Sequence, residues 1–352
     1  MLAQQRSHLA GAQEFIIGGL LNACFQAAAG LLALLLLSRT QTGLAQDTGS
    51  SRAFKFLMGT QVRVETFGGT LQLRQAATDE AFAAVAEVDR IMSDYRDDSE
   101  LMMVNRTAAL RPVRVSDPLF AVLDAASRVF DASGGAFDAS IRPLHVLTGL
   151  KNRQAHQPTP AELANIRPLV GFRQVALDRS SQTVKFARSG MALDLTGIAH
   201  GFASEFAAGS LRRRGLTGVV DTGTPYVVGA PPGKSASSVG IGKPGTPAQL
   251  LGAVDVKDAA VATVTATANG FPRFDPRTLQ PVAAALSATV ISPDGTLAEA
   301  LANAVLALGP RDGLALLERF DRAWGLVVFR KSDRSLGIAV TQSQQRSFHP
   351  VR

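Results

Sequence analysis

The sequence predicts an α+β fold with a mixed or antiparallel sheet and packed helices. Several segments carry apolar residues at helical spacing, and others alternate apolar and polar residues with a period of two. Many of the alternating segments come in adjacent pairs separated by short turns, as hairpins do. Hairpins between helices favour an α+β architecture over parallel β-α-β units. With 352 residues, of which 46% are hydrophobic, the chain is long enough for a large core.

The first half of the expected domain starts with a hairpin and continues with helices. A strand at 55–67 is followed by two glycines that turn the chain into a second strand at 70–74. Helices are predicted over 78–92 and 117–134 from their apolar stripes. The segment 143–168 is rich in proline and polar residues, which predicts a loop containing a short helix.

The second half contains most of the expected strands. These cover 175–177, 183–187, 218–229 with an interruption at 222–225, 285–292, 324–329 and 336–340. Helices are expected at 297–308 and 313–319, separated by Gly309 and Pro310, which end a helix. The segment 231–245 is rich in glycine, proline and serine and is expected to be a loop.

The amino terminus differs from the remainder of the chain. The stretch from Phe15 to Leu37 is almost uninterrupted apolar sequence, long enough to span a bilayer. We therefore interpret 1–45 as a signal peptide or membrane anchor that engages the membrane during export, followed by a linker at 46–53. The domain is expected over 54–345, with a tail at 346–352. Cys24 is the only cysteine, so the remainder of the chain has no disulfide and no thiol nucleophile.

The basic balance of the chain does not indicate a nucleic-acid partner. The formal net charge is +7, but lysine and arginine are spread along the sequence, and Arg212, Arg213 and Arg214 are the only tight cluster. That triplet falls at the end of a predicted helix, where cations complement the helix dipole. A solvated helix end is a better interpretation than a nucleic-acid patch.

The stretch 191–205 is the most informative one for chemistry. Apolar residues alternate around Asp194 and then recur at helical spacing after Gly197, so a short strand is expected to turn into a helix at that glycine. Such a junction presents free backbone N–H groups and the positive helix end, which suit an anionic ligand. Asp194 would then favour a metal ion or a ligand hydroxyl. The alternative is structural, with Asp194 as a helix cap and Gly197 in a tight turn.

Three further features have both a functional and a structural interpretation. The glycine pair before Ala136, Phe137 and Asp138 would let backbone approach a ligand, or would simply end a helix. Glu299 and Asn303 lie one turn apart on a helix that is apolar on both faces, an arrangement that suits Mg²⁺ or two hydrogen-bonded side chains. A lone histidine such as His200 is more often a packed or surface residue than a catalyst.

In chain order these pieces resemble the ApbE family of FAD:protein FMN transferases. The resemblance covers most of the chain after Phe54. It rests on Met58-Gly-Thr60, Ser93-Asp-Tyr95 with Asp98-Ser-Glu-Leu101 and Asn105, Gly134-Gly-Ala-Phe-Asp138 with Pro143-Leu144, Leu193-Asp-Leu-Thr-Gly-Ile-Ala-His-Gly201, Asp275-Pro-Arg-Thr278 and the segment 297–309.

The resemblance implies the ApbE-like fold, FAD as substrate, Mg²⁺, and a site for both. The positions that match FAD-binding ones are Met58, Tyr95, Ala136, Phe137, Asp138, Asp194 and His200. Gly197 matches the backbone that binds Mg²⁺ together with the last helix, here through Glu299 and Asn303. The family is exported, which implies a periplasmic enzyme or one attached to the periplasmic face of the inner membrane. Its partner is an acceptor redox protein that receives FMN on a serine or threonine.

Several positions depart from the family pattern. The metal helix usually offers aspartate and threonine where this chain has Glu299 and Asn303. A histidine implicated in catalysis is replaced by Pro272, which cannot transfer a proton, and His200 stands where lysine is common. The glycine-rich turn around Gly223 and the segment around Val264 also differ. Three functions are therefore open: a divergent FMN transferase with His200 as substitute base, a non-catalytic flavin-binding protein, or an FAD pyrophosphatase.

Overall fold

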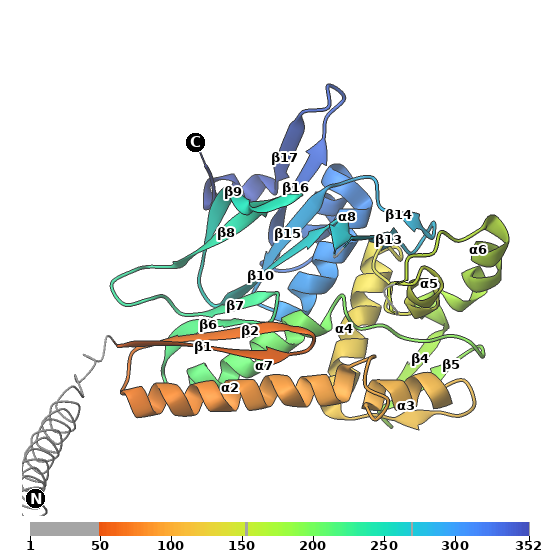
Figure 1. The fold of residues 1–352 in the computed structure, drawn as a ribbon, viewed down its shortest axis with the longest axis horizontal. Helices are drawn as coiled ribbons and strands as arrows, with labels where there is room; N and C mark the ends of the chain where they lie inside the picture. The colour runs from red at the N-terminus through yellow and green to blue at the C-terminus, as the bar shows by residue number, and fades with distance from the viewer. Residues whose placement is uncertain (1–48, 152–153, 269, 352) are drawn as a thin grey trace, which may run out of the picture. The chain divides into compact units, whose positions relative to one another are not determined.

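The computed structural model describes residues 49–151, 154–268 and 270–351, and an eight-stranded sheet is its largest element (Figure 1). Every neighbouring pair of strands in it is antiparallel. In spatial order the strands are β1 (Ser50–Leu57), β2 (Thr60–Phe67), β6 (Thr217–Asp221), β7 (Pro225–Val228), β10 (Ala259–Thr265), β15 (Ser287–Ser292), β16 (Trp324–Arg330) and β17 (Leu336–Val340). The predicted α+β class with an antiparallel sheet is confirmed.

Three helices cover one face of this sheet. α2 (Leu71–Met92) packs on β1 and β2, α7 (Ala199–Arg213) on β6 and β7, and α8 (Gly295–Leu317) on β10, β15 and β16. α8 breaks at Gly309, whose φ of 79° is non-helical, as the predicted division into two helices requires. Among the described helices, α8 alone is long and apolar enough to cross a membrane, but most of its apolar stretch is buried inside the domain.

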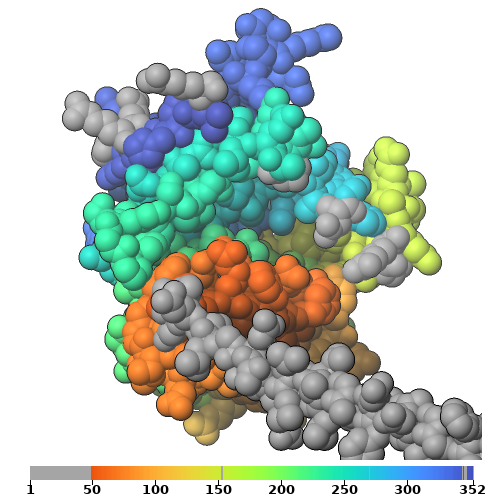
Figure 2. All heavy atoms as spheres, turned by 60° about the vertical axis from the view of Figure 1, so that its left-hand side comes forward, coloured from red at the N-terminus to blue at the C-terminus, as the bar shows by residue number. Residues whose placement is uncertain are grey.

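A three-stranded sheet covers the opposite face. It consists of β8 (Ser237–Lys243), β9 (Thr246–Val256) and β18 (Phe348–Pro350), and the segment around β8 and β9 lies above the β1–β2 hairpin in Figure 2. Neighbouring residues of the central strands point to opposite layers: Val220 packs toward the helices and Val219 toward the small sheet. The central strands of the large sheet are therefore buried on both faces.

The small sheet changes two expectations. The segment 231–245, predicted as a loop, contains β8. Ile241 and the partly buried Val239 alternate with glycines there and pack into the hydrophobic cluster between the two sheets. The expected tail 346–352 contains β18, whose Phe348 pairs with Val254 of β9. Both segments therefore belong to the domain.

The amino-terminal hairpin lies upstream of its predicted place. Its strands are β1 and β2, with Met58 at a φ of 52° in the turn, so the single strand predicted at 55–67 is two strands. The strand predicted at 70–74 is wrong, because the Thr70 hydroxyl caps α2 by accepting from the Leu73 N–H at 3.2 Å. β1 begins at Ser50, inside the predicted linker 46–53. The predicted signal peptide or anchor at 1–45 lies outside the described residues.

α4 (Asp117–Ser133) packs on α8, and most of the remaining elements lie on that side of the molecule (Figure 1), whereas η3 (Gln342–Ser347) follows β17 and contacts β18. The helix predicted at 117–134 is confirmed and ends at Gly134, whose φ is 62°. The other elements are α3 (Glu100–Thr107), β3 (Val113–Arg114), α5 (Arg142–Leu147), α6 (Pro160–Ile166), η1 (Arg167–Leu169), η2 (Phe172–Gln174), β4 (Val175–Asp178), β5 (Thr183–Phe186), β11 (Thr267–Ala268), β12 (Phe271–Pro272), β13 (Phe274–Asp275), β14 (Gln280–Pro281) and η3 (Gln342–Ser347).

Candidate functional site

A cavity of about 230 Å³ lies between the loop before α7, the segment around α5, α8 and the strands β11 to β13. Its volume is below the roughly 300–1,000 Å³ of sites that enclose a whole drug-sized ligand. A dinucleotide would therefore place only part of itself inside. Seven of the ten predicted site residues line it, namely Tyr95, Ala136, Phe137, Asp138, Asp194, Gly197 and Asn303.

The stretch 191–195 borders the cavity without joining a sheet. The Asn105 side chain accepts from the Leu193 N–H at 2.7 Å and donates to the Leu193 carbonyl at 3.0 Å. The Asp194 N–H donates to the Ala139 carbonyl at 2.8 Å. These bonds take the place of a strand ladder, so the short strand predicted here is absent and α7 begins at Ala199. The backbone of Asp194 is thereby fixed by side chains and loops.

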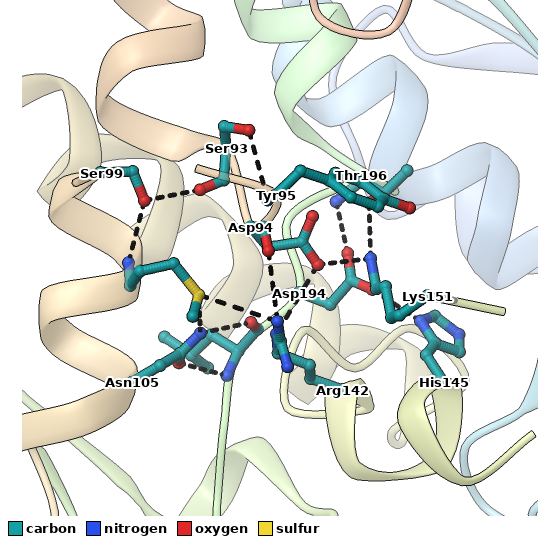
Figure 3. Close-up of polar contacts among 12 residues, drawn as sticks. Ser93, Asp94, Tyr95, Ser99, Asn105, Arg142, His145, Lys151, Asp194 and Thr196 are labelled. Carbon is teal, nitrogen blue, oxygen red and sulfur yellow. Dashed lines mark hydrogen bonds and ion pairs between the residues drawn. The ribbon is translucent and has the colours of Figure 1, made fainter. Parts of the chain in front are cut away.

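Two buried carboxylates and three basic side chains form a charge cluster at the cavity wall (Figure 3). Asp94 follows α2 and Asp194 precedes α7, whereas Arg142 and His145 come from α5 and Lys151 from the loop after it. His145 Nδ1 lies 2.6 Å from Asp194 Oδ2, and Lys151 Nζ lies 2.7 Å from the same oxygen. Lys151 also pairs with Asp94, whose Oδ2 lies 3.6 Å from Arg142 Nε.

The cluster sets the charge of its acids. Burial raises the pKa of Asp94, and the charge of Asp194 raises it further. Burial acts in the same direction on Asp194, but the charge of Lys151 and the hydrogen bond from His145 outweigh it and hold the pKa of Asp194 well below its usual value. Burial lowers the pKa of Lys151, but the two carboxylates outweigh it and raise that pKa. Asp194 and Lys151 are therefore charged at neutral pH, and Asp94 is the more easily protonated acid.

The predicted Gly-Gly-Ala-Phe-Asp turn has a structural explanation as well as a place at the cavity. Gly134 ends α4 in the left-handed region, as the alternative interpretation of the glycines requires. Asp138 accepts from the Ser140 N–H at 2.8 Å and from the Phe172 N–H at 3.2 Å. Burial raises its pKa against those hydrogen bonds. Its carboxylate thus holds the loop that brings Ala136 and Phe137 to the cavity.

Glu299 lies at the crossing of α7 and α8. Its Oε2 accepts from the Gly201 N–H of α7 at 2.7 Å, and Glu205 of α7 accepts from the Gly295 N–H of α8 at the same distance. The two glutamates thus cap each other's helices reciprocally, satisfying N–H groups that have no partner within their own helix. A Cβ on Gly201 would lie 2.0 Å from the Gly295 carbonyl oxygen, so the crossing needs glycine.

The predicted magnesium ligands do not fit Mg²⁺ as they are arranged. The Gly197 carbonyl accepts from Asn303 Nδ2 at 3.2 Å, Asn303 Oδ1 accepts from Arg273 Nη1 at 3.2 Å, and Glu299 is turned to α7. Mg²⁺ requires oxygens converging at about 2.0–2.1 Å without competing donors. Within the described residues there is no group of three or more His, Cys, Asp or Glu side chains that could hold a metal.

The three other predicted residues lie outside the lining of the cavity. Met58 is half-buried in the β1–β2 turn and packs against the main core. His200 is the second residue of α7, and its Nδ1 is buried without a hydrogen-bond partner among the described residues. Its role as a base stays a prediction that the cavity does not support. Glu299 contacts the backbone of α7 at the crossing of α7 and α8 instead of the cavity.

Sequence patterns missed the basic residues of the site. Arg142 and His145 lie three residues apart on α5, and His145 and Lys151 fall within the segment 143–168, which is predicted mainly as a loop. Arg273 is a half-buried charged residue between Phe271 and Phe274, where a cation is unusual. Those two local features were the available signals, but the partners of these side chains are distant in sequence.

An antiparallel sheet covered by helices, with a charged cavity beside the start of α7, defines an α+β domain with a candidate site for an anionic ligand. The chain belongs to the ApbE family, whose model matches residues 58–326. The resemblance inferred from the motifs is thereby confirmed.

Two curated relatives show the same family. The FAD:protein FMN transferase of Treponema pallidum is 31% identical over 313 residues, which cover 82% of this chain and 86% of the relative. The FAD:protein FMN transferase of Haemophilus influenzae is 26% identical over 297 residues, covering 77% and 84%.

Solved structures show the fold. The flavin transferase ApbE from Vibrio cholerae has a TM-score of 0.75 at 23% identity, covering 85% of this chain and 99% of that one. The ApbE protein from Thermotoga maritima has a TM-score of 0.75 at 21% identity, with the same coverage. Identities this low support the shared architecture alone.

Proposed function

We propose that this protein is an FAD:protein FMN transferase that moves FMN from FAD to a serine or threonine of an acceptor redox protein. The observation that carries the proposal is the cavity, because its wall brings together Tyr95, the segment 136–138 and Asp194, which match FAD-binding positions of the family, with Gly197 and Asn303, which match its metal-binding ones. Family membership and the curated relatives named above support the same activity.

The reaction requires one bond to form and one to break. The acceptor hydroxyl oxygen attacks the phosphorus on the FMN side of the diphosphate, a new P–O bond forms, and the bond to the bridging oxygen breaks as AMP leaves. The hydroxyl proton passes to a base. The protein must therefore supply a base and fixed positive charge close to the diphosphate.

His145 is the base that the geometry favours. It lines the cavity, and its Nδ1 lies 2.6 Å from the ionised Asp194 carboxylate. A proton on Nδ1, donated to Asp194, leaves Nε2 with a lone pair that can accept the hydroxyl proton. Pro272, which stands where the resemblance expects a histidine, also lines the cavity but cannot take a proton.

The positive charge comes from the protein's own side chains in this proposal. Mg²⁺ is expected from the resemblance, but the oxygens of Gly197 and Asn303 already accept hydrogen bonds, and Glu299 faces α7. We therefore assign no step to a metal. Lys151 and Arg273 both line the cavity and can hold phosphate oxygens.

A non-catalytic flavin-binding protein is the second candidate. The observation that favours it is Pro272, which removes a proton acceptor from the cavity while the binding residues remain. FAD pyrophosphatase activity, in which water replaces the acceptor hydroxyl, is an outcome that the same assay detects.

The proposal also includes export. The apolar stretch from Phe15 to Leu37 supports a signal peptide or anchor, and a periplasmic location would bring the enzyme to membrane-associated redox acceptors. Cell fractionation, with mass spectrometry of the mature amino terminus, tests this. A protein recovered in the cytosol with an intact amino terminus contradicts it.

The activity is tested by incubating the purified protein with FAD and a candidate acceptor domain, then measuring flavin fluorescence on the denatured acceptor. His145→Gln should abolish labelling but retain FAD binding, whereas His156→Gln, at an exposed histidine paired with Glu162, should change neither. AMP release without a labelled acceptor supports the pyrophosphatase. FAD binding without either product supports the binding protein.

A further inference from the structure

The Arg273 side chain is fixed at the place where the resemblance expects a metal. Its backbone N–H donates to the Ala266 carbonyl at 2.8 Å, which anchors the residue beside β10. Its Nε donates to the Thr265 carbonyl at 3.1 Å, and Nη1 donates to Asn303 Oδ1 at 3.2 Å. Two bonds in different directions hold the guanidinium plane over α8.

The contacts of Asn303 show that this arrangement is specific. Its Nδ2 donates to the Gly197 carbonyl at 3.2 Å and to the Glu299 carbonyl at 3.0 Å. Both neighbours on that side are acceptors, and Arg273 on the other side is a donor, so only this amide orientation satisfies all of them. A Cβ on residue 197 would lie 3.2 Å from Asn303 Nδ2, so a larger residue there would press on this amide.

Charge also favours a guanidinium here. Glu299 is buried and has no salt-bridge partner within the described ranges, and Arg273 is one of the positive charges that act on it. Burial lowers the pKa of Arg273, while Glu299 and Asp194 oppose that effect. An arginine remains protonated under such conditions because its intrinsic pKa is far above neutral.

Donors remain for a ligand. Arg273 lines the cavity with Thr196 and Gly197, and among the described contacts its Nη2 has no protein acceptor. A guanidinium edge of this kind binds phosphate oxygens with two parallel hydrogen bonds.

We propose that Arg273 is the resident cation of this site and takes the place of a divalent metal in holding the diphosphate of FAD. The inference rests on the proposed function for the identity of the ligand. It goes beyond that function by making the cation part of the chain, so that FAD binding is independent of added metal.

The first test uses Mn²⁺ alone, followed by electron paramagnetic resonance and calorimetry. The wild-type protein should bind no Mn²⁺ at this site, and Arg273→Met should create a site that is lost again when Asn303→Leu is added. Arg277→Met is the matched control, because Arg277 pairs with Asp275 at 2.7 Å instead of Asn303, and it should not create a site. Mn²⁺ binding by the wild type that disappears in Asn303→Leu overturns the proposal.

The second test measures FAD binding by fluorescence in EDTA and then with excess Mg²⁺. Wild-type affinity should be the same in both, whereas Arg273→Met should lose roughly 10- to 100-fold in EDTA, as expected for loss of a charged hydrogen-bond pair, and recover with Mg²⁺. Wild-type binding that requires Mg²⁺ overturns the proposal. If Arg273→Met does not fold, Arg273→Lys retains the charge and should still bind FAD in EDTA; a Mg²⁺ requirement there contradicts the proposal.

The two proposals fail separately. Metal-independent FAD binding without FMN transfer refutes the transferase and supports the role of Arg273. FMN transfer together with FAD binding that requires Mg²⁺ supports the transferase and refutes the role of Arg273. If FAD does not bind at all, the Mn²⁺ experiment still decides whether Arg273 fills a metal position.

Discussion

Replacing Lys151 by methionine tests the charge cluster at the cavity wall. Only 11% of the Lys151 side chain is exposed, and its Nζ pairs with both Asp94 and Asp194. Removing one partner of a buried ion pair costs about 3–5 kcal/mol. Arg142 and His145 remain beside the two acids, so we expect the lower end, about 3 kcal/mol, which lowers the Tm by roughly 6 °C in a domain of this size.

The pH dependence of that loss identifies its cause. In the wild type the lowered pKa of Asp194 stabilises the fold above the unfolded pKa, and this contribution is lost only as pH falls through the folded value. Without Lys151 the pKa of Asp94, which burial already raises, rises further, and Asp194 loses the largest cause that lowers its pKa, so the penalty is larger at pH 8 than at pH 5, where Asp94 takes up a proton more readily. Thermal melts across this range measure it, with Lys185→Met, at an exposed lysine of β5, as control. An equal loss at pH 5 and pH 8, or no loss, would refute the electrostatic explanation.

Three further substitutions test the packing that positions the site. Gly201→Ala should destabilise the protein by about 3 kcal/mol, because the new Cβ would lie 2.0 Å from a carbonyl oxygen of α8. In the control Gly209→Ala, on the same helix, the new Cβ meets only the flexible end of an arginine, and stability should rise by up to about 1 kcal/mol. Equal melting temperatures for the two variants would contradict the close contact at the helix crossing. Glu299→Gln should retain FAD binding, since glutamine still accepts from the Gly201 N–H. The variant should also be more stable than the wild type, by an amount that grows with pH, because burial raises the pKa of Glu299 and the ionised form is costly above its unfolded pKa. A loss of FAD binding would indicate that Glu299 is a metal ligand instead. Asn105→Leu should lower the free energy of unfolding by about 2–4 kcal/mol and weaken FAD binding, because it releases the Leu193 backbone. Denaturant unfolding and FAD titration measure the two effects. Unchanged values would mean that other contacts hold the stretch 191–195.

Local patterns predicted the fold best where one segment contains its own signal. The break of α8 follows from Gly309 and Pro310, and the hairpin of β16 and β17 follows from two adjacent short apolar segments. The amino-terminal hairpin was misplaced because Thr70 looks like a strand residue, whereas its hydroxyl caps a helix. A cap is decided by one hydrogen bond, which periodicity does not contain.

The binding residues of the site were predictable and their partners were not. Asp194 and Asn303 belong to recognisable local stretches, but the groups that bind them are 49 and 30 residues away, at His145 and Arg273. Such pairs depend on how distant loops meet in the fold. Sequence spacing therefore gave the acceptors of the site, and the structure added the donors that change its chemistry.

If Arg273 is the resident cation of the site, a divalent metal is excluded from the same place. The buried acids near the cavity are Asp94, Asp138, Asp194 and Glu299, and the cations are Arg142, Lys151 and Arg273. A divalent cation beside the guanidinium would add two positive charges at short range in a poorly screened environment, and repulsion there is strong. A diphosphate, in contrast, would meet the open edge of Arg273 and the ammonium of Lys151, which line the same cavity. The neutral acceptor oxygen of Asn303 fits this arrangement, because an ionised side chain at position 303 would pair with the guanidinium and withdraw it from the diphosphate.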